Sequence, residues 1–382
     1  MHWKISLFSA MIEIIPWRDG EKRRNGKNHR PCRFSIRKKP GSARGFLHRS
    51  RGQCAPQACT QARGKTGKSG PAAFSKLKTG GFVMLYSIID VGSNSIRMTI
   101  FRHENDTLDM LMNKKSMAGL AGYVEKGALN EAGIKKCCEE IRSFVKLAQN
   151  LEVDQISIIA TASLRNVSNL EEVQAALENA VGRRAEVLTG QEEARLDFVG
   201  ASHYLNVQSG VLIDIGGGST ELVQFKDGKI QHLQSLPIGS LNLYTQYSSS
   251  LFPTEKDRKQ MRQRVKKEFS SIDWLPLSGP VTLCGIGGTA RGFFKLCREL
   301  YNVPKCQTEV DAGYVREINK KLKTQDFRQL QSIYRVVPDR VFTILPGMTI
   351  LNQAVKKFGP EHFVVSKPGI REGYLFDRIL RS

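Results

Sequence analysis

The chain has 382 residues, of which 40% are hydrophobic and 25% are charged. This is ordinary globular composition for about two domains, and it excludes a collagen, a chain disordered throughout and a small disulfide scaffold. No segment approaches the ~18 consecutive apolar residues of a membrane-spanning helix, so an integral membrane protein is not expected.

The net charge of +22 is unevenly distributed along the chain. Residues 1–83 carry 19 Lys and Arg against 3 Asp and Glu, a net charge of +16. Residues 84–382 carry 39 against 33, a net charge of +6. The mild excess over residues 84–382 suits an anionic small substrate at least as well as DNA, so a nucleic-acid partner is not the expectation.

Residues 1–83 are predicted to be a disordered basic segment, because residues 18–78 are rich in Arg, Lys, Gly, Ser and Pro and show no sustained period. A signal peptide is a weak alternative, since Glu13 interrupts the apolar run and no clean cleavage site follows. A basic arm for nucleic acid or membrane rests on charge alone. The favoured hypothesis is that the segment is not native coding sequence, because Met84 stands directly before the first convincing strand.

The eight cysteines form no CxxC pair, and no His stands at metal-finger spacing from them. They are predicted to be reduced, buried thiols of a cytoplasmic protein rather than zinc ligands or a redox centre.

From residue 84 onward, strand and helix patterns alternate, which predicts an α/β protein. The pattern begins again near residue 210, so two similar domains are expected, 84–207 and 208–382, with a linker near 206–210 and a cleft between them. Strands are predicted over 85–90, 96–102, 156–161, 211–214, 220–225, 281–285 and 362–365. Helices are predicted over 130–151, 169–181, 191–204, within 236–247, over 254–269, to about 300 after the loop 285–289, and from 369.

An apolar strand that ends in Asp and runs into a Gly-containing turn occurs twice, as IDVGSN (89–94) and IDIGGGST (213–220). A buried carboxylate needs a cation or several donors, and glycine lets a ligand approach the backbone closely. One such turn is usually a plain hairpin, but two copies favour a cradle for phosphate oxygens with a carboxylate set back to hold Mg²⁺. GIGGT (285–289) is a third candidate phosphate loop.

Six motifs in order resemble the motif series of the exopolyphosphatase / guanosine pentaphosphate phosphohydrolase (Ppx/GppA) family. They are IDVGSNSIR (89–97), ATASLR (160–165), TGQEEAR (189–195), IDIGGGSTEL (213–222), GIGGTAR (285–291) and GIREG (369–373). The resemblance covers Met84 to Ser382 and implies an actin/Hsp70/sugar-kinase-like fold, with two ribonuclease-H-like domains around a central cleft. It also implies Mg²⁺-dependent release of terminal orthophosphate from inorganic polyphosphate or guanosine pentaphosphate (pppGpp).

Longer members of the family append a helical domain, so this chain is expected to be a short, two-domain form. Less surface for a long polymer favours short polyphosphate chains or pppGpp as substrate. The resemblance leaves a homodimer open.

The resemblance also implies roles for individual acids. Glu193 matches the catalytic base that activates water, and a helix turns Glu192 ~100° away from it. From the residues alone, a Glu-Glu pair would be a solvated helix face. Glu221 matches a second acidic site, for Mg²⁺ or for positioning water. Asp90 and Asp214 are the expected ligands of Mg²⁺ or of its water.

Two arginines, Arg97 and Arg165, match family residues expected to clamp phosphate, a geometry that suits the guanidinium fork, although surface ion pairs are commoner in general. Two departures from the family pattern are Asn166, in place of Asp, and Asn242, where an Arg is common. The loss of one cation is expected to shift substrate preference. The predicted phosphate contacts are Ser93, Asn94, Arg97, Arg165, Gly216, Gly217, Gly218, Ser219, Thr220, Gly287 and Gly288.

Three other functions stay open at this point. A phosphate- or nucleotide-binding sensor on the same fold would lack turnover, which the presence of both Glu193 and Glu221 argues against. An ATP-using kinase or chaperone would need a fuller adenosine pocket. A nucleic-acid binder would depend on residues 1–83.

Overall fold

The computed structural model of the chain describes residues 33–35, 83–105, 107–248, 250, 252–274, 277, 279–322 and 327–381. The predictions of disorder and non-native origin for residues 1–83 therefore fall almost entirely outside the described residues. No helix in the described ranges has the length and apolarity needed to cross a bilayer.

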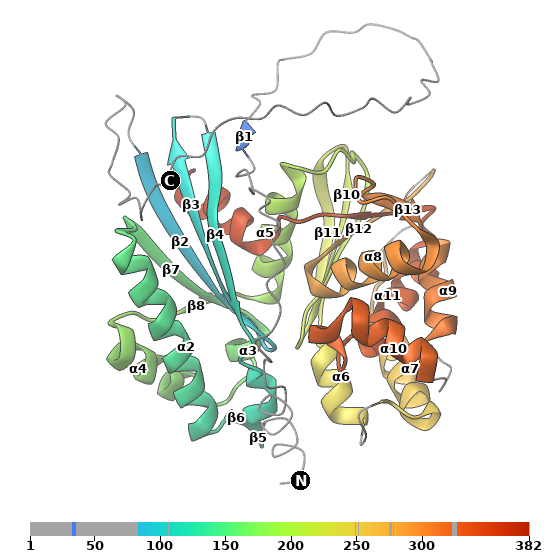
Figure 1. Cartoon of the computed structure of the whole chain (residues 1–382), viewed down its shortest axis with the longest axis horizontal. Helices are drawn as coiled ribbons and strands as arrows, with labels where there is room; N and C mark the ends of the chain where they lie inside the picture. Colours follow the sequence, from blue (N-terminus) through green and yellow to red (C-terminus); the bar gives the residue numbers. More distant parts are fainter. Residues whose placement is uncertain are drawn as a thin grey trace, which may run out of the picture.

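Two six-stranded sheets stand side by side, each with helices packed on it (Figure 1), which confirms the predicted α/β class. The first sheet has the order β1-β4-β3-β2-β7-β8 and the second β11-β10-β9-β12-β14-β13. The first comprises β1 (Arg33–Ser35), β2 (Val83–Val91), β3 (Ile96–Glu104), β4 (Thr107–Ser116), β7 (Gln155–Ala160) and β8 (Glu186–Val187). The second comprises β9 (Gly210–Ile215), β10 (Thr220–Lys226), β11 (Lys229–Leu236), β12 (Thr282–Ile286), β13 (Glu309–Asp311) and β14 (His362–Val365).

Each sheet is built around a central hairpin, and the two hairpins have the same pairing pattern. In the first, β2 pairs antiparallel with β3 and parallel with β7. In the second, β9 pairs antiparallel with β10 and parallel with β12. The two Asp residues hold equivalent places, but Asp90 lies opposite Arg97 whereas Asp214 lies opposite Glu221. The repeat that the sequence predicts is therefore present in the structure. The residue opposite the aspartate differs in charge, because it is a cation in the first sheet and an acid in the second.

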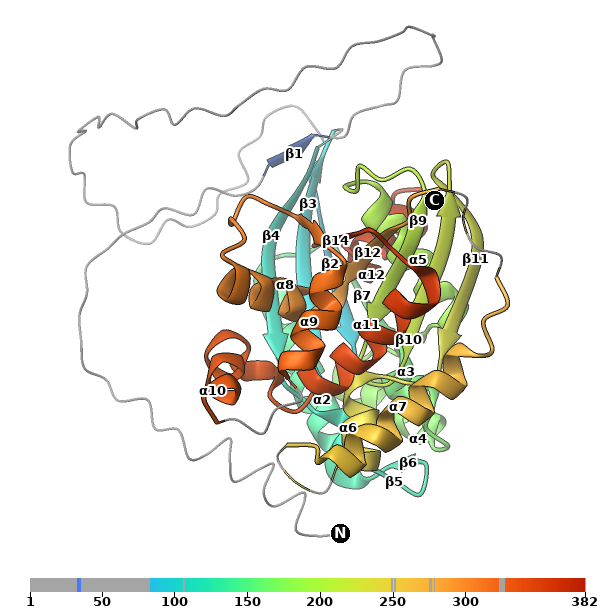
Figure 2. The ribbon, with the colours of Figure 1, turned by 90° about the vertical axis from the view of Figure 1, so that its right-hand side faces the viewer.

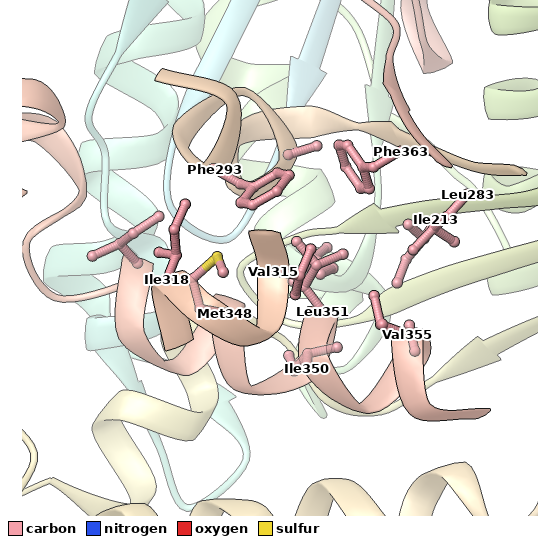
Figure 3. Close-up of a cluster of buried hydrophobic side chains, with 14 of the residues drawn as sticks. Ile213, Leu283, Phe293, Val315, Ile318, Met348, Ile350, Leu351, Val355 and Phe363 are labelled. Atoms are coloured by element: carbon pink, nitrogen blue, oxygen red, sulfur yellow. The ribbon is translucent and has the colours of Figure 1, made fainter. Parts of the chain in front are cut away.

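Helices cover the outer face of each sheet, the face that points away from the other sheet (Figures 1 and 2). In the first domain, β2 contributes Ile89 and Val91 to a cluster shared with α2 and α4. In the second, Phe293 packs edge-on against Phe363, with ring centroids 4.9 Å apart (Figure 3). Fully burying a Phe side chain contributes ~1.5–3 kcal/mol, so these clusters fix both sheets firmly.

The outer helices have the following bounds. Those of the first domain are α2 (Glu131–Asn150) and α4 (Leu170–Val181), with α3 (Ala162–Arg165) after β7 and a small hairpin of β5 (Val124–Glu125) and β6 (Ala128–Leu129) after η1 (Leu120–Tyr123). Those of the second are α6 (Ser240–Tyr247), α7 (Glu255–Phe269), α8 (Gly287–Tyr301), α9 (Gly313–Lys321), α10 (Phe327–Val336), η2 (Pro338–Arg340) and α11 (Ile344–Phe358).

Two helical segments lie between the sheets and join them (Figure 1). Helix α5 (Gly190–Ser202) packs Phe198 with the second sheet and Leu196 with the first. The C-terminal α12 (Ile370–Tyr374) and a π-helical turn, η3 (Leu375–Ile379), return to the first sheet and contact α5. The domain ranges 84–207 and 208–382 stay a prediction, and the structure adds that the last residues cross back to the first sheet.

The sequence patterns missed β4 and β11, because both are strands with interrupted apolar alternation. β4 ends in Asn113-Lys-Lys-Ser116, and β11 exposes most of its first half. Each pairs with the strand directly before it in the chain, and the Asp227-Gly228 turn between β10 and β11, with both residues at positive φ, is a hairpin signal that the predictions overlooked. Five cysteines are described, all as free thiols, and four of them are buried as predicted, but Cys306 is exposed.

The contact between α5 and α12 depends on glycine, which gives a first prediction. A methyl group added at Gly373 would collide with the Leu196 carbonyl and approach the Gly200 nitrogen, both backbone atoms that cannot rotate away. We expect Gly373→Ala to lower the free energy of unfolding by ~1–3 kcal/mol, measured by urea denaturation. Gly122→Ala is the matched control, because nothing lies within 4 Å of its added methyl group. Equal midpoints for the two variants would contradict this account of the joint.

Candidate active site

The two Asp-Gly turns face each other across the gap between the domains. A methyl group at Gly217 would lie 3.1 Å from the Ser93 Cβ, and one at Gly218 would lie 2.7 Å from the Ser93 Oγ. A side chain at Gly218 would therefore have to displace the Ser93 hydroxyl of the opposite turn. Together the turns line a cavity of about 140 Å³, the size of a small anion with a few waters.

Most of the predicted site residues line this one cavity. Arg165, Thr220 and Glu221 are the predicted residues that do not line it. Those that do are Asp90, Ser93, Asn94, Arg97, Glu193, Asp214, Gly216, Gly217, Gly218, Ser219, Gly287 and Gly288.

The local structure of α5 separates its two adjacent glutamates. Thr189 caps the helix by accepting a hydrogen bond from the Glu192 nitrogen, and the Glu192 carboxylate accepts one from the Thr189 nitrogen at 2.9 Å. This reciprocal capping turns Glu192 outward. Glu193 is buried, at 9% exposure, and lines the cavity, so one member of the pair faces the gap as expected.

Arg165 contacts two acids and also the cavity-lining Ser219, to whose Oγ its Nη2 donates at 3.5 Å. Its Nη1 donates to the Glu193 Oε2 at 2.8 Å and to the Leu188 carbonyl at 2.9 Å. Its Nη2 lies 4.0 Å from the Glu221 Oε1. The side chain predicted as a phosphate clamp thus neutralises and orients the glutamates.

Burial and mutual repulsion raise the pKa values of both glutamates. Burial raises the pKa of Glu193 well above its ordinary value, the charge of Glu221 adds to this, and Arg165 opposes it. Burial, with the charge of Asp214, raises the pKa of Glu221 to about 7. Ser235 opposes that rise by donating to the Glu221 Oε1 at 2.8 Å. Both shifts move these carboxyls out of the ordinary acidic range, in the direction that favours a general base at neutral pH.

Asp90 and Asp214 are the carboxylates that reach the cavity from the strand ends. Burial raises the pKa of each, and arginines oppose the rise, with Arg371 the largest opposing charge for Asp90 and Arg291 for Asp214. Gly287 has φ 73° and lies against the Asp214 carboxylate so closely that any side chain would collide with it.

This donor set suits Mg²⁺. Among the described residues, no three His, Cys, Asp or Glu side chains gather as a complete metal site. Mg²⁺ is commonly held by one or two carboxylates, with water and substrate phosphates completing the octahedron. Asp90 and Asp214 can supply such a partial site.

Cations line the cavity in larger number than the motifs indicated. Arg340 reaches it from η2, and its guanidinium occupies the space that a side chain at Gly288 would need. Burial lowers the pKa of Arg291 to about 10, so it remains charged at neutral pH. Arg371 lies within the GIREG motif (369–373), but no role was predicted for it. Arg340 lies in none of the six motifs, so no sequence pattern indicated it. The lining cations are Arg97, Arg291, Arg340, Lys367 and Arg371.

Residues behind the second turn hold its shape. The Asn242 amide donates to the Gly218 carbonyl at 2.8 Å and accepts from the Gly239 nitrogen at 2.7 Å. The Thr220 hydroxyl donates to the Ile238 carbonyl at 2.6 Å. Asn242 therefore braces the turn, and Thr220 supports it from behind.

Comparison with known proteins places the chain in a family. Residues 99–382 match the model of the Ppx/GppA phosphatase family, and the chain belongs to that family. A guanosine-5'-triphosphate,3'-diphosphate pyrophosphatase of Aliivibrio fischeri is 23% identical over 304 residues, 77% of this chain and 59% of the relative. The chain thus spans less than two thirds of the length of this curated relative.

Solved structures agree with the fold. The Aquifex aeolicus member of the Ppx/GppA family is 28% identical, with a TM-score of 0.64 over 78% of this chain and 98% of that one. An exopolyphosphatase from Cytophaga hutchinsonii, 22% identical, has a TM-score of 0.69 over 77% of this chain and 97% of that one. The predicted family and the actin/Hsp70/sugar-kinase-like fold are confirmed.

The position of Arg165 gives a second prediction. Arg165→Met leaves Glu193 and Glu221 buried without their cation, so their pKa values should rise further. We expect a loss of ~3–5 kcal/mol in the free energy of unfolding at pH 8, where both are ionised in the unfolded chain. The loss should shrink as the pH falls through the raised folded-state pKa values toward 5, because both carboxyls are then protonated when folded.

Arg184→Met is the matched control for this denaturation series. Arg184 and its partner Glu171 are 48% and 82% exposed, so the variant should lose less than ~1 kcal/mol at either pH. A pH-independent loss in Arg165→Met would contradict the assigned charge balance.

Proposed function

We propose that this protein is a phosphohydrolase that releases terminal orthophosphate from inorganic polyphosphate or pppGpp. One observation carries the proposal: a buried glutamate, two strand-end aspartates and several arginines line the same small cavity between two Gly-rich turns. A relative named as a pppGpp pyrophosphatase and a fold neighbour named as an exopolyphosphatase support this substrate class.

In the proposed reaction, Glu193 accepts a proton from a water molecule while the oxygen of that water attacks the terminal phosphorus. The bond from that phosphorus to the bridging oxygen breaks, and the shortened chain leaves with the bridging oxygen. Backbone N–H groups of the turns and the Ser93 hydroxyl would donate to the phosphate oxygens, and Arg97 and Arg340 would balance the charge of the phosphate. Such fixed donors are arranged before the reaction, which is the main source of electrostatic catalysis.

Asp90 and Asp214 would hold Mg²⁺, which when bound supplies charge neutralisation of the phosphate oxygens. Glu221, behind the cavity, acts on Glu193 through its charge and through their shared Arg165. The proposal extends to a cytoplasmic setting, which the free thiol state of the described cysteines supports.

Glu193→Gln tests the proposed base. We expect phosphate release from short polyphosphate, long polyphosphate or pppGpp, assayed with and without Mg²⁺, to fall by ~10²–10⁴-fold, because glutamine cannot accept the proton of the attacking water. Glu192→Gln is the matched control: it removes an adjacent, exposed carboxylate and should leave turnover unchanged. Equal slow release from wild type and Glu193→Gln would instead support a phosphate- or nucleotide-binding sensor.

The pH profile tests the coupling of the two glutamates. Glu193 must be ionised to act as a base, so activity should fall as the pH drops through its raised pKa. Glu221→Gln removes a charge that raises this pKa, so the acidic limb of log kcat/KM should move to lower pH. Glu268→Gln, on α7 and outside the cavity, should leave the limb in place. A limb that does not move in Glu221→Gln would refute the coupling.

A further inference from the structure

Asp197 is an acid of the cavity that no motif predicted and that the mechanism above does not use. It lies four residues after Glu193 on α5, so the two side chains share one face of the helix. It lines the cavity, and its side chain is 1% exposed. Gly369 leaves room for it, since a methyl group there would lie 3.2 Å from the Asp197 Oδ1.

Neither carboxylate oxygen of Asp197 has a hydrogen-bond partner among the described residues. By contrast, Glu193 accepts a hydrogen bond from Arg165, and Glu221 accepts one from Ser235. The charged groups that act most strongly on Asp197 are themselves acids, with Asp214 first. A buried carboxylate in such surroundings requires either a proton or a cation that is not part of the protein.

We infer that Asp197 is a further ligand of the same divalent cation that is proposed for Asp90 and Asp214, and that phosphate oxygens of the substrate complete its coordination. Carboxylates together with phosphate and water match the way Mg²⁺ is bound beside phosphates. Since the described acids do not form a complete site alone, the cation and the phosphate should each strengthen the binding of the other by the same factor. This inference rests on the proposed function for the identity of the anion.

The test uses Mn²⁺ as the probe, with its free concentration followed by electron paramagnetic resonance, on the full chain with and without inorganic orthophosphate. We expect wild type to bind one Mn²⁺ tightly only when phosphate is present, and Asp197→Asn to weaken that binding by at least ~10-fold. Asp109→Asn is the matched control: Asp109, on β4, is also buried and has one unpartnered oxygen, but it lies outside the cavity and pairs with Arg102 on β3.

Thermal unfolding provides a readout that separates a ligand from a structural residue. Without metal, Asp197→Asn should melt at or above the wild-type temperature, because it removes a buried unpaired charge. Mn²⁺ with phosphate should then raise the melting temperature of wild type and of Asp109→Asn but not that of Asp197→Asn. If Asp197→Asn does not fold, Asp197→Ser replaces it and is held to the same outcomes.

The inference is overturned if Asp197→Asn binds Mn²⁺ as wild type does, or if wild type binds none in either condition. Its failure is distinct from failure of the proposed function, because Mn²⁺ binding needs no turnover. Binding that depends on Asp197 in a protein that releases no phosphate would support the cation site and refute the hydrolase. Phosphate release by a protein in which Asp197→Asn leaves Mn²⁺ binding unchanged would support the hydrolase and refute the role of Asp197 as a cation ligand.

Discussion

The burial of like charges where two sheets meet is the constraint on which the site depends. Asp90, Asp214, Glu193 and Asp197 line one small cavity, although each loses most of its hydration there. Carboxylates tolerate such a position only beside cations, hydrogen-bond donors or protons. The ring of arginines on the opposite walls, and the anion and cation that we propose to enter, answer that requirement.

The two hairpins that carry the aspartates are built alike, but they are charged differently. In the first, Asp90 lies opposite Arg97, so the hairpin is close to neutral at its tip. In the second, Asp214 lies opposite Glu221, and both need outside compensation. Arg165 supplies part of it from the first domain, at 4.0 Å from Glu221. The duplicated scaffold therefore places one aspartate from each hairpin at the cavity, with a cation opposite the first and an acid opposite the second.

Helix α5 connects this chemistry to the stability of the whole molecule. Its inner positions pack on both sheets, its first turn presents Glu193, and one turn later it presents Asp197. The C-terminal α12 holds it in place through glycine contacts, and η3 does so through the Arg195–Asp377 pair, with N–O distances of 2.6 and 2.8 Å. Any shift of α5 would move both acids relative to the turns, so the joint between domains and the geometry of the site are one feature.

Local sequence patterns were enough to predict the α/β class and the repeat, because both depend on apolar strands that end in Asp and run into Gly-rich turns. The family, and Glu193 as the candidate base, came from the resemblance of six ordered motifs, since a Glu-Glu pair alone indicates only a solvated helix face. Only the tertiary structure decided which side chains share the cavity. Arg165, Thr220 and Glu221 do not line it, whereas Arg340 and Asp197, which no motif contains, do. Their roles depend on approaches between segments far apart in the chain, such as Gly288 with Arg340, and neither periodicity nor spacing records such a distance.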